Sequence, residues 1–151
     1  RAMAAVPGAI VGAGTVLNAA MLDQAIAAGA AFIVSPGLTG GLAEAAIRSG
    51  VPFLPGVATA GDIMRGLDLG LSRFKFFPAE AAGGTAALKA LSAPFGDIRF
   101  CPTGGITADT APGWLALGSV SCVGGTWIAR PGDHDLASVA ERASAAARLK
   151  A

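Results

Sequence analysis

The chain has 151 residues, of which 53% are hydrophobic and 14% are charged, and its 11 Lys+Arg against 10 Asp+Glu give a formal net charge of +1. This composition excludes an intrinsically disordered chain, and the balanced charge argues against a nucleic-acid partner because no basic surface would neutralise the phosphates. Pro and Gly interrupt the long uncharged stretches at residues 2–22 and 110–129, so no membrane span is expected either.

Short apolar runs recur along the chain, and each ends in a cluster of Gly, Pro, Ser or Thr, as strands do. The predicted strands cover residues 9–16, 31–38, 52–57, 73–80, 99–106 and 120–128. Because these runs are nearly continuous and do not alternate with polar residues, they favour a parallel sheet that is covered on both faces.

Helical patterns lie between the strands and carry start and stop signals. Three predicted helices begin at Asn18, Thr39 and Thr59 and end at Gly29, Gly50 and Gly70. Thr59 and Asp62 have the spacing of a capping box. A final helix over residues 135–149 places one apolar stripe along its length, made of Leu136, Val139, Ala140 and Ala143.

The strand and helix units repeat evenly. Polar residues at the strand ends are mostly about 20 to 28 positions apart, which favours a (β/α)8 TIM barrel over an open sheet. Six units of about 25 residues fill the chain, and eight units would need roughly 200 residues. We therefore expect an α/β fold of TIM-barrel type, with residues 1–151 forming a single domain that holds about six of the eight βα units.

One lysine lies inside an aromatic strand, Arg73-Phe74-Lys75-Phe76-Phe77. Alternation sends Lys75 and Phe77 to one face of the strand and Phe74 and Phe76 to the other. A lysine with the ordinary pKa of about 10.4 is protonated at neutral pH, and desolvation by apolar neighbours is one way in which nucleophilic lysines are prepared. Lys75 is therefore either a Schiff-base nucleophile or a strand-end lysine whose stem covers apolar surface.

Two glycine pairs, Gly104-Gly105 and Gly124-Gly125, follow the last two predicted strands. Backbone N–H groups that no Cβ screens are suited to a phosphate, although a tight turn is an equally good explanation of a single pair. Barrels that bind phosphate commonly hold it between the loops after strands seven and eight. If these are those two strands, the first two strands of the barrel are missing from the sequence.

The other reactive side chains favour structural roles. Cys101 and Cys122 lack metal-ligand or redox spacing and are interpreted as buried, reduced thiols, which suggests a cytoplasmic protein. His134 is interpreted as a solvated loop residue or a helix cap, because a lone histidine offers no metal site. Glu80 is either a carboxylate that supports the lysine or a helix-start acid, and we favour the second.

Six segments occur in an order and at a spacing that point to one family. They are residues 12–18 (GAGTVLN), 35–39 (SPGLT), 55–59 (PGVAT), 73–80 (RFKFFPAE), 99–106 (RFCPTGGI) and 122–127 (CVGGTW). Together they closely resemble the bacterial 2-keto-3-deoxy-6-phosphogluconate aldolases, which also include 4-hydroxy-2-oxoglutarate aldolase activity. The resemblance runs from about Val6 to the last helix.

The resemblance implies a role for eight residues. Lys75 would be the Schiff-base lysine, and Thr15 and Thr103 would be the threonines of the pyruvate pocket. Phe77 matches the aromatic residue that packs near the pyruvyl group. The phosphate end would be held by Gly104, Gly105, Gly125 and the hydroxyl of Thr126, where many relatives have serine.

The function implied by the resemblance is class I aldol cleavage of a phosphorylated keto acid, with no metal or organic cofactor, in a homotrimer. The substrate would be 2-dehydro-3-deoxy-6-phosphogluconate, with 4-hydroxy-2-oxoglutarate as a further candidate. In the family, a glutamate base and a carboxylate-binding arginine lie on the second barrel strand, and no residue before Val6 matches them. These residues are therefore expected to be the C-terminal six units of a longer polypeptide.

Two other interpretations stay open on the sequence alone. A phosphosugar isomerase or epimerase would use the same barrel and phosphate loops without an imine. A catalytically incomplete barrel fragment would act as a structural or interaction module. Covalent attachment of pyruvate to Lys75 distinguishes the aldolase from both.

Overall fold

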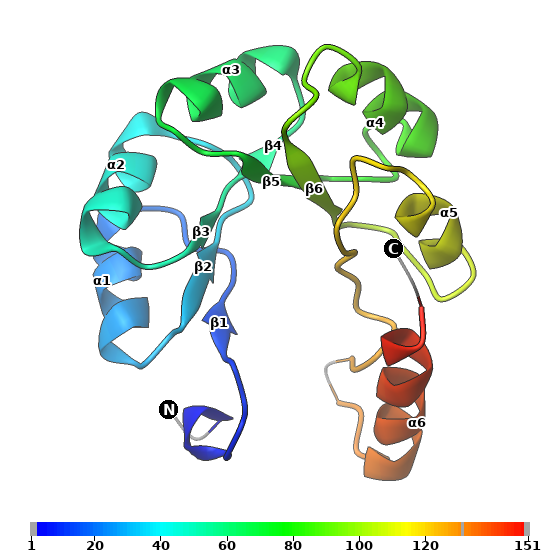
Figure 1. The fold of residues 1–151 in the computed structure, drawn as a ribbon. Coiled ribbons are helices and arrows are strands. Elements are labelled where there is room, and N and C mark those ends of the chain that lie inside the picture. The colour runs from blue at the N-terminus through cyan, green and yellow to red at the C-terminus, as the bar shows by residue number, and fades with distance from the viewer. Residues whose placement is uncertain (1–2, 131, 150–151) are drawn as a thin grey trace. The chain divides into compact units, whose positions relative to one another are not determined.

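The computed structural model describes residues 3–130 and 132–149. Short strands and helices follow one another along the chain (Figure 1). The strands are β1 (Gly12–Ala13), β2 (Phe32–Val34), β3 (Phe53–Leu54), β4 (Gly56–Val57), β5 (Arg73–Phe76) and β6 (Arg99–Pro102). The helices are the 3-10 helix η1 (Met3–Ala5), α1 (Ala19–Ala27), α2 (Gly40–Ser49), α3 (Ala60–Asp68), α4 (Gly84–Ser92), α5 (Ala111–Leu115) and α6 (Leu136–Ala147). The chain divides after Lys75 into two compact units.

The first unit contains a parallel sheet with the strand order β1-β2-β3. In its register, Gly12 aligns with Phe32, and Ile33 aligns with Phe53. Helices α1 and α2 lie on the same face of this sheet (Figure 1). The buried cluster that joins the two layers consists of Val16, Leu22, Ile33, Leu42 and Ala46. The predicted α/β class with parallel strands is therefore confirmed.

A proline divides the third predicted strand, residues 52–57, into two. β3 pairs with β2, whereas β4 pairs with β5. Pro55 lies between them and is buried, and its carbonyl oxygen accepts a hydrogen bond from the Lys75 N–H at 2.8 Å. Because proline has no N–H to donate, one ladder cannot run through this position.

The second unit is built around the end of β5 and around β6. The Thr103 N–H donates to the carbonyl oxygen of Phe76, the last residue of β5, at 3.0 Å. Trp114 of α5 is 1% exposed, and its ring centroid lies 6.2 Å from that of Phe76. Phe100 of β6 and Leu88 of α4 are also buried. Helices and strand ends of this unit therefore share an apolar core.

The sixth predicted strand, residues 120–128, is not a strand in the described part of the chain. Two isolated parallel bridges replace it, one between Phe100 and Val120 and the other between Thr103 and Gly124. The two bridges are three residues apart on one segment, from Phe100 to Thr103, and four residues apart on the other, from Val120 to Gly124. The second segment therefore contains one extra residue, which interrupts the ladder. The prediction of a regular strand over residues 120–128 is therefore wrong, although Val120 is bridged to Phe100 of β6.

Helix α6 also differs from expectation. Its predicted apolar stripe is not buried, since no residue of α6 is buried and Leu136 is 77% exposed. Polar contacts hold the helix instead: the Arg142 guanidinium donates to the carbonyl oxygen of Ile128 at 2.8 Å and pairs with Asp133. Among residues 3–130 and 132–149, no helix is long and apolar enough to cross a membrane.

Two of the three predicted helix caps are confirmed. The Asn18 side chain accepts a hydrogen bond from the Met21 N–H at 2.9 Å. Thr59 and Asp62 form the predicted capping box at the start of α3, with each side chain accepting from the other residue's backbone N–H. Thr39 precedes α2 but makes no side-chain cap hydrogen bond.

The substitution Asp62→Asn is expected to destabilise α3 in a pH-dependent way. Burial raises the pKa of Asp62, but hydrogen bonds from the Ala58 N–H and from Thr59 outweigh it and hold the pKa below its usual value of 3.8. Because the folded-state pKa is lowered, this stabilisation is present above the unfolded-state pKa and is lost as the pH falls through the folded-state pKa. We expect the substitution to lower the free energy of unfolding by about 1 kcal/mol at neutral pH.

Urea titrations of both proteins at about pH 7 and about pH 3 measure this effect, and the difference between them is expected to shrink at the lower pH. A difference of the same size at both pH values would contradict the role given to the ionised carboxylate.

Candidate active site

Lys75 lies in β5 between two buried phenylalanines. Phe74 and Phe76 are 0% and 1% exposed, whereas Lys75 is half-buried, so the predicted alternation along this strand is confirmed. The hydrogen bond from the Lys75 N–H to Pro55 fixes the register of the strand at this residue. Lys75 therefore lies one residue before the carboxyl end of β5. In α/β proteins, the reactive groups lie at this end of the parallel strands.

Thr15 belongs to the same unit and has an unusual backbone conformation. It is exposed, lies two residues after β1, and has a φ of 60°. No other non-glycine residue in the described part of the chain has a positive φ. This left-handed conformation costs about 1 to 3 kcal/mol, and such strain is concentrated at functional sites. Both predicted site residues of the first unit thus lie at or just beyond the carboxyl ends of parallel strands.

In the second unit, Thr103 precedes Gly104 in the chain, and the Phe77 ring lies close to Gly104. The Ala79 N–H donates to the Thr103 carbonyl oxygen at 2.9 Å. The edge of the Phe77 ring lies 3.3 Å from the point where a Cβ on Gly104 would be. Phe77 and Thr103 are both half-buried. The predicted aromatic residue and the second predicted threonine therefore both lie next to Gly104.

The two glycine pairs lie next to each other in this unit. Thr103 is bridged to Gly124, and the carbonyl oxygen of Ile106 is 3.1 Å from the Cβ position of Gly125. In the described part of the chain, no protein group accepts a hydrogen bond from four backbone N–H groups, those of Gly104, Gly105, Gly125 and Thr126. N–H groups of this kind can bind a phosphate or a carboxylate, and Thr126 adds an exposed hydroxyl.

Glu80 lies near the start of α4, as its interpretation as a helix-start acid predicts, although it is not part of the helix. It lies in a turn four residues before α4 begins at Gly84. Its Oε1 accepts a hydrogen bond from the indole Nε1–H of Trp114 at 2.9 Å. No sequence pattern connects these two residues, which are 34 positions apart. The only hint was the place of Glu80 at the end of the RFKFFPAE motif.

The two cysteines lie together in the second unit. Both are free thiols, but Cys101 is only half-buried and Cys122 is exposed, so the predicted burial is wrong for Cys122 and only partly correct for Cys101. A hydrogen bond with the Cys101 side chain lowers the pKa of the Cys122 thiol from 9.0 to about 7. The Cys101 Sγ also lies 3.9 Å from the Thr103 Oγ1. The pair is therefore adjacent to a predicted site residue.

Alkylation of Cys122 by iodoacetamide is expected to reach half of its maximal rate near pH 7, because the thiolate is the reacting form. Cys101→Ala removes the hydrogen bond and is expected to move this midpoint toward 9, the ordinary value. Peptide mass spectrometry after timed alkylation at several pH values measures both midpoints. An unchanged midpoint in Cys101→Ala would mean that Cys101 does not control the thiol.

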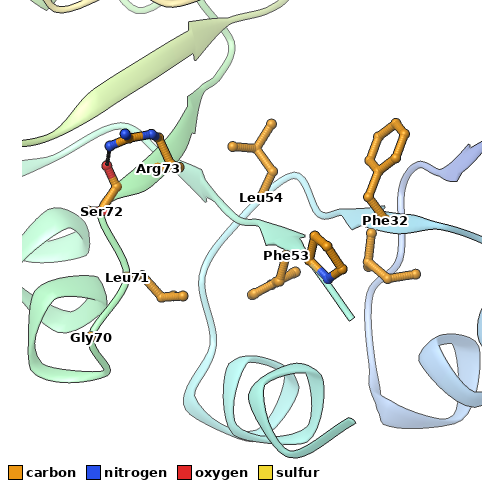
Figure 2. Close-up of a pocket in the computed structure, with 9 residues that line it drawn as sticks. Phe32, Phe53, Leu54, Gly70, Leu71, Ser72 and Arg73 are labelled. Carbon is orange, nitrogen blue, oxygen red and sulfur yellow. Dashed lines mark hydrogen bonds between the residues drawn. The ribbon is translucent and has the colours of Figure 1, made fainter. Parts of the chain in front are cut away.

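A cavity of about 450 Å³ in the first unit is lined by none of the predicted site residues, and Figure 2 shows the residues that line it. Its lining includes Phe32, Phe53 and Arg73, which are the first residues of β2, β3 and β5. The cavity therefore lies at the amino ends of the strands, whereas reactive groups in such folds lie at the carboxyl ends. It is not the candidate site.

A metal centre is not apparent in the described residues, where no group of three or more His, Cys, Asp or Glu side chains could hold an ion. His134 is exposed and precedes Asp135, whose carboxylate caps α6. This agrees with the interpretation of His134 as a solvated loop residue.

Parallel strands, connecting helices and a lysine near the carboxyl end of a strand define an α/β protein of the class that keeps its chemistry at its strand ends. Residues 1–141 match the family described as KDPG and KHG aldolase. The chain is 55% identical over 150 residues to a 2-dehydro-3-deoxy-phosphogluconate aldolase of Zymomonas mobilis, a match that covers 99% of this chain and 72% of the relative.

Solved structures give the same result. The 2-keto-3-deoxy-6-phosphogluconate aldolase of Zymomonas mobilis ZM4 with 3-phosphoglycerate matches with a TM-score of 0.94 at 55% identity, over 97% of this chain and 70% of that chain. The KDPG aldolase of Legionella pneumophila, with pyruvate captured as a covalent carbinolamine intermediate, matches with a TM-score of 0.86 at 40% identity, over 96% of this chain and 70% of that chain. The chain belongs to the KDPG and KHG aldolase family, as its six motifs indicate.

Proposed function

We propose that the protein is a class I aldolase that cleaves 2-dehydro-3-deoxy-6-phosphogluconate to pyruvate and D-glyceraldehyde 3-phosphate. The observation that carries this proposal is the 55% identity to the Zymomonas mobilis aldolase across 99% of the chain. The family description includes KHG aldolases, so 4-hydroxy-2-oxoglutarate, which would give pyruvate and glyoxylate, is the second substrate.

Lys75 is the nucleophile in this mechanism. Its neutral amine adds to the C2 carbonyl of the substrate, and loss of water from the resulting carbinolamine gives an iminium ion. A base removes the C4 hydroxyl proton, the C3–C4 bond breaks, and its electron pair moves into the iminium to form an enamine. Protonation at C3 and hydrolysis release pyruvate and restore the lysine. The covalent pyruvate carbinolamine of the Legionella pneumophila relative supports this chemistry.

The remaining predicted residues are assigned to the two ends of the substrate. Thr15, Thr103 and Phe77 bind the pyruvyl end, and the strained backbone of Thr15 supports this assignment. The phosphate end is held by the backbone of the two glycine loops together with the hydroxyl of Thr126. With a formal net charge of +1, the chain relies on these N–H groups rather than on a cluster of cations.

We also propose that the chain supplies the C-terminal six βα units of a (β/α)8 barrel in a cytoplasmic homotrimer. Both crossover helices of the β1-β2-β3 sheet lie on one face, which fits a barrel, whereas a doubly wound sheet carries helices on both faces (Figure 1). An intact mass equal to these 151 residues, together with full aldolase turnover, would contradict the six-unit proposal. Light scattering, which measures the molar mass of the assembly in solution, tests the homotrimer.

Pyruvate release by the longer polypeptide that contains these 151 residues, measured with a coupled dehydrogenase assay, tests the function. We expect turnover of both substrates, with kcat/KM higher for the phosphorylated one by about tenfold or more, because its phosphate adds charge-assisted hydrogen bonds. Release of no pyruvate from either compound would contradict the proposal. Interconversion of phosphosugars in its place would favour an isomerase.

A further inference from the structure

Glu80 connects the Gly104-Gly105 turn to the core of the second unit. The Glu80 N–H donates to the carbonyl oxygen of Gly104 at 3.0 Å, next to the bond from the Ala79 N–H to Thr103. Its carboxylate accepts from Trp114, which is 1% exposed. One residue therefore links the backbone of the turn to a buried indole.

The side-chain stem of Glu80 packs directly against Gly105. A Cβ on Gly105 would lie 2.8 Å from both the Cβ and the Cγ of Glu80, closer than real Cβ atoms approach. Gly105 has a φ of +83° and Gly104 a φ of +107°, a region that side chains rarely adopt. The Glu80 stem thus packs against the turn in this conformation. The Gly104 and Gly105 N–H groups donate to no described group.

The two carboxylate oxygens of Glu80 lie near two different helices. Oε1 is bonded to the indole, and Oε2 lies 3.7 Å from the Cβ position of Gly84, the first residue of α4. A carboxylate near a helix N-terminus is stabilised by the exposed N–H groups of the first turn. The carboxylate therefore lies between Trp114 of α5, which donates to it, and the first residue of α4.

We propose that Glu80 is a positioning residue for the phosphate-binding turn: it holds Gly104 and Gly105 so that their N–H groups meet the phosphate of the substrate. This inference rests on the proposed function and adds a residue that itself does not touch the substrate. We therefore expect that removing the Glu80 side chain weakens the binding of the phosphorylated substrate and does not prevent imine formation at Lys75.

The test compares two substrates in Glu80→Ala, Glu80→Asp and Glu80→Gln. In Glu80→Ala and Glu80→Asp, which lack a group that reaches Trp114, we expect the KM for 2-dehydro-3-deoxy-6-phosphogluconate to rise about tenfold with kcat within about twofold. The KM for unphosphorylated 4-hydroxy-2-oxoglutarate is expected to stay unchanged. Glu80→Gln keeps the stem and an acceptor oxygen for the indole and is expected to restore most of the affinity.

Leu88→Ala is the matched control, because Leu88 is 0% exposed in the neighbouring α4 and is not one of the residues assigned to the substrate. It is expected to lower the Tm without changing the ratio of the two KM values. An unchanged KM ratio in both Glu80→Ala and Glu80→Asp, with the wild-type enzyme active, would overturn this inference alone. Absence of turnover in the wild-type protein would overturn the proposed function as well.

Discussion

Replacing Lys75 by arginine is expected to lower aldolase turnover by at least about 10³-fold, the scale seen when a covalent nucleophile is removed. The guanidinium keeps the positive charge and a long apolar stem, but it stays protonated and cannot form an imine. Loss of activity would therefore report the missing nucleophile and not a missing charge. Pyruvate release from 2-dehydro-3-deoxy-6-phosphogluconate, assayed at several enzyme concentrations, measures the effect.

Lys89 offers a matched control, since it lies exposed in α4. Lys89→Arg is expected to keep wild-type turnover and wild-type stability. If Lys75→Arg retained more than about a tenth of the wild-type rate, the proposed mechanism would fail, because an arginine cannot replace an imine-forming amine.

Truncating Phe74 is expected to cause a large loss of stability. Phe74 is 0% exposed in β5, and its ring packs on α3 so closely that a Cβ on Gly66 would lie 2.3 Å from it. Phe74→Ala removes this ring from a site that cannot collapse fully, so we expect the free energy of unfolding to fall by about 3 to 5 kcal/mol. Urea denaturation followed by circular dichroism measures the loss as a lower midpoint at an unchanged m value.

Phe74→Leu is the control for Phe74→Ala, because it keeps most of the buried volume and is expected to cost about 1.5 kcal/mol or less. A loss below about 1 kcal/mol in Phe74→Ala would show that β5 and α3 do not depend on this contact. Lys75 would then not lie on a strand that is held rigidly against α3.

Local patterns in the sequence were sufficient for the parts of the fold that depend on neighbouring residues. Alternation around Lys75 predicted that Phe74 and Phe76 share one face of the strand, and both are buried; capping signals predicted the starts of α1 and α3. These features depend on spacing within one strand or one turn, which the sequence displays directly.

Features that depend on distant pairing could not be predicted. The extra residue between the bridges at Val120 and Gly124 is defined only against β6, so the apolar pattern of residues 120–128 indicated a regular strand. Pro55 carried a visible signal, since proline cannot donate to a ladder, but the pattern of residues 52–57 was interpreted as one strand.

The candidate site also contains features that the sequence predicted and features that only the fold shows. The roles of Lys75 and the glycine pairs came from residue type, position after a strand and resemblance. The hydrogen bond between Glu80 and Trp114 and the contact between Cys101 and Cys122 join segments that only the folded chain brings together. The sequence offers no period or motif that links either pair.

Trapping with borohydride tests the central claim most directly. The protein is incubated with pyruvate and sodium borohydride, digested, and its peptides are mapped by mass spectrometry. We expect a reduced pyruvyl adduct on the peptide that contains Lys75, and no adduct there in Lys75→Arg. An active enzyme that forms no adduct, or forms its adduct on a different lysine, would contradict the assignment of Lys75 as the Schiff-base residue.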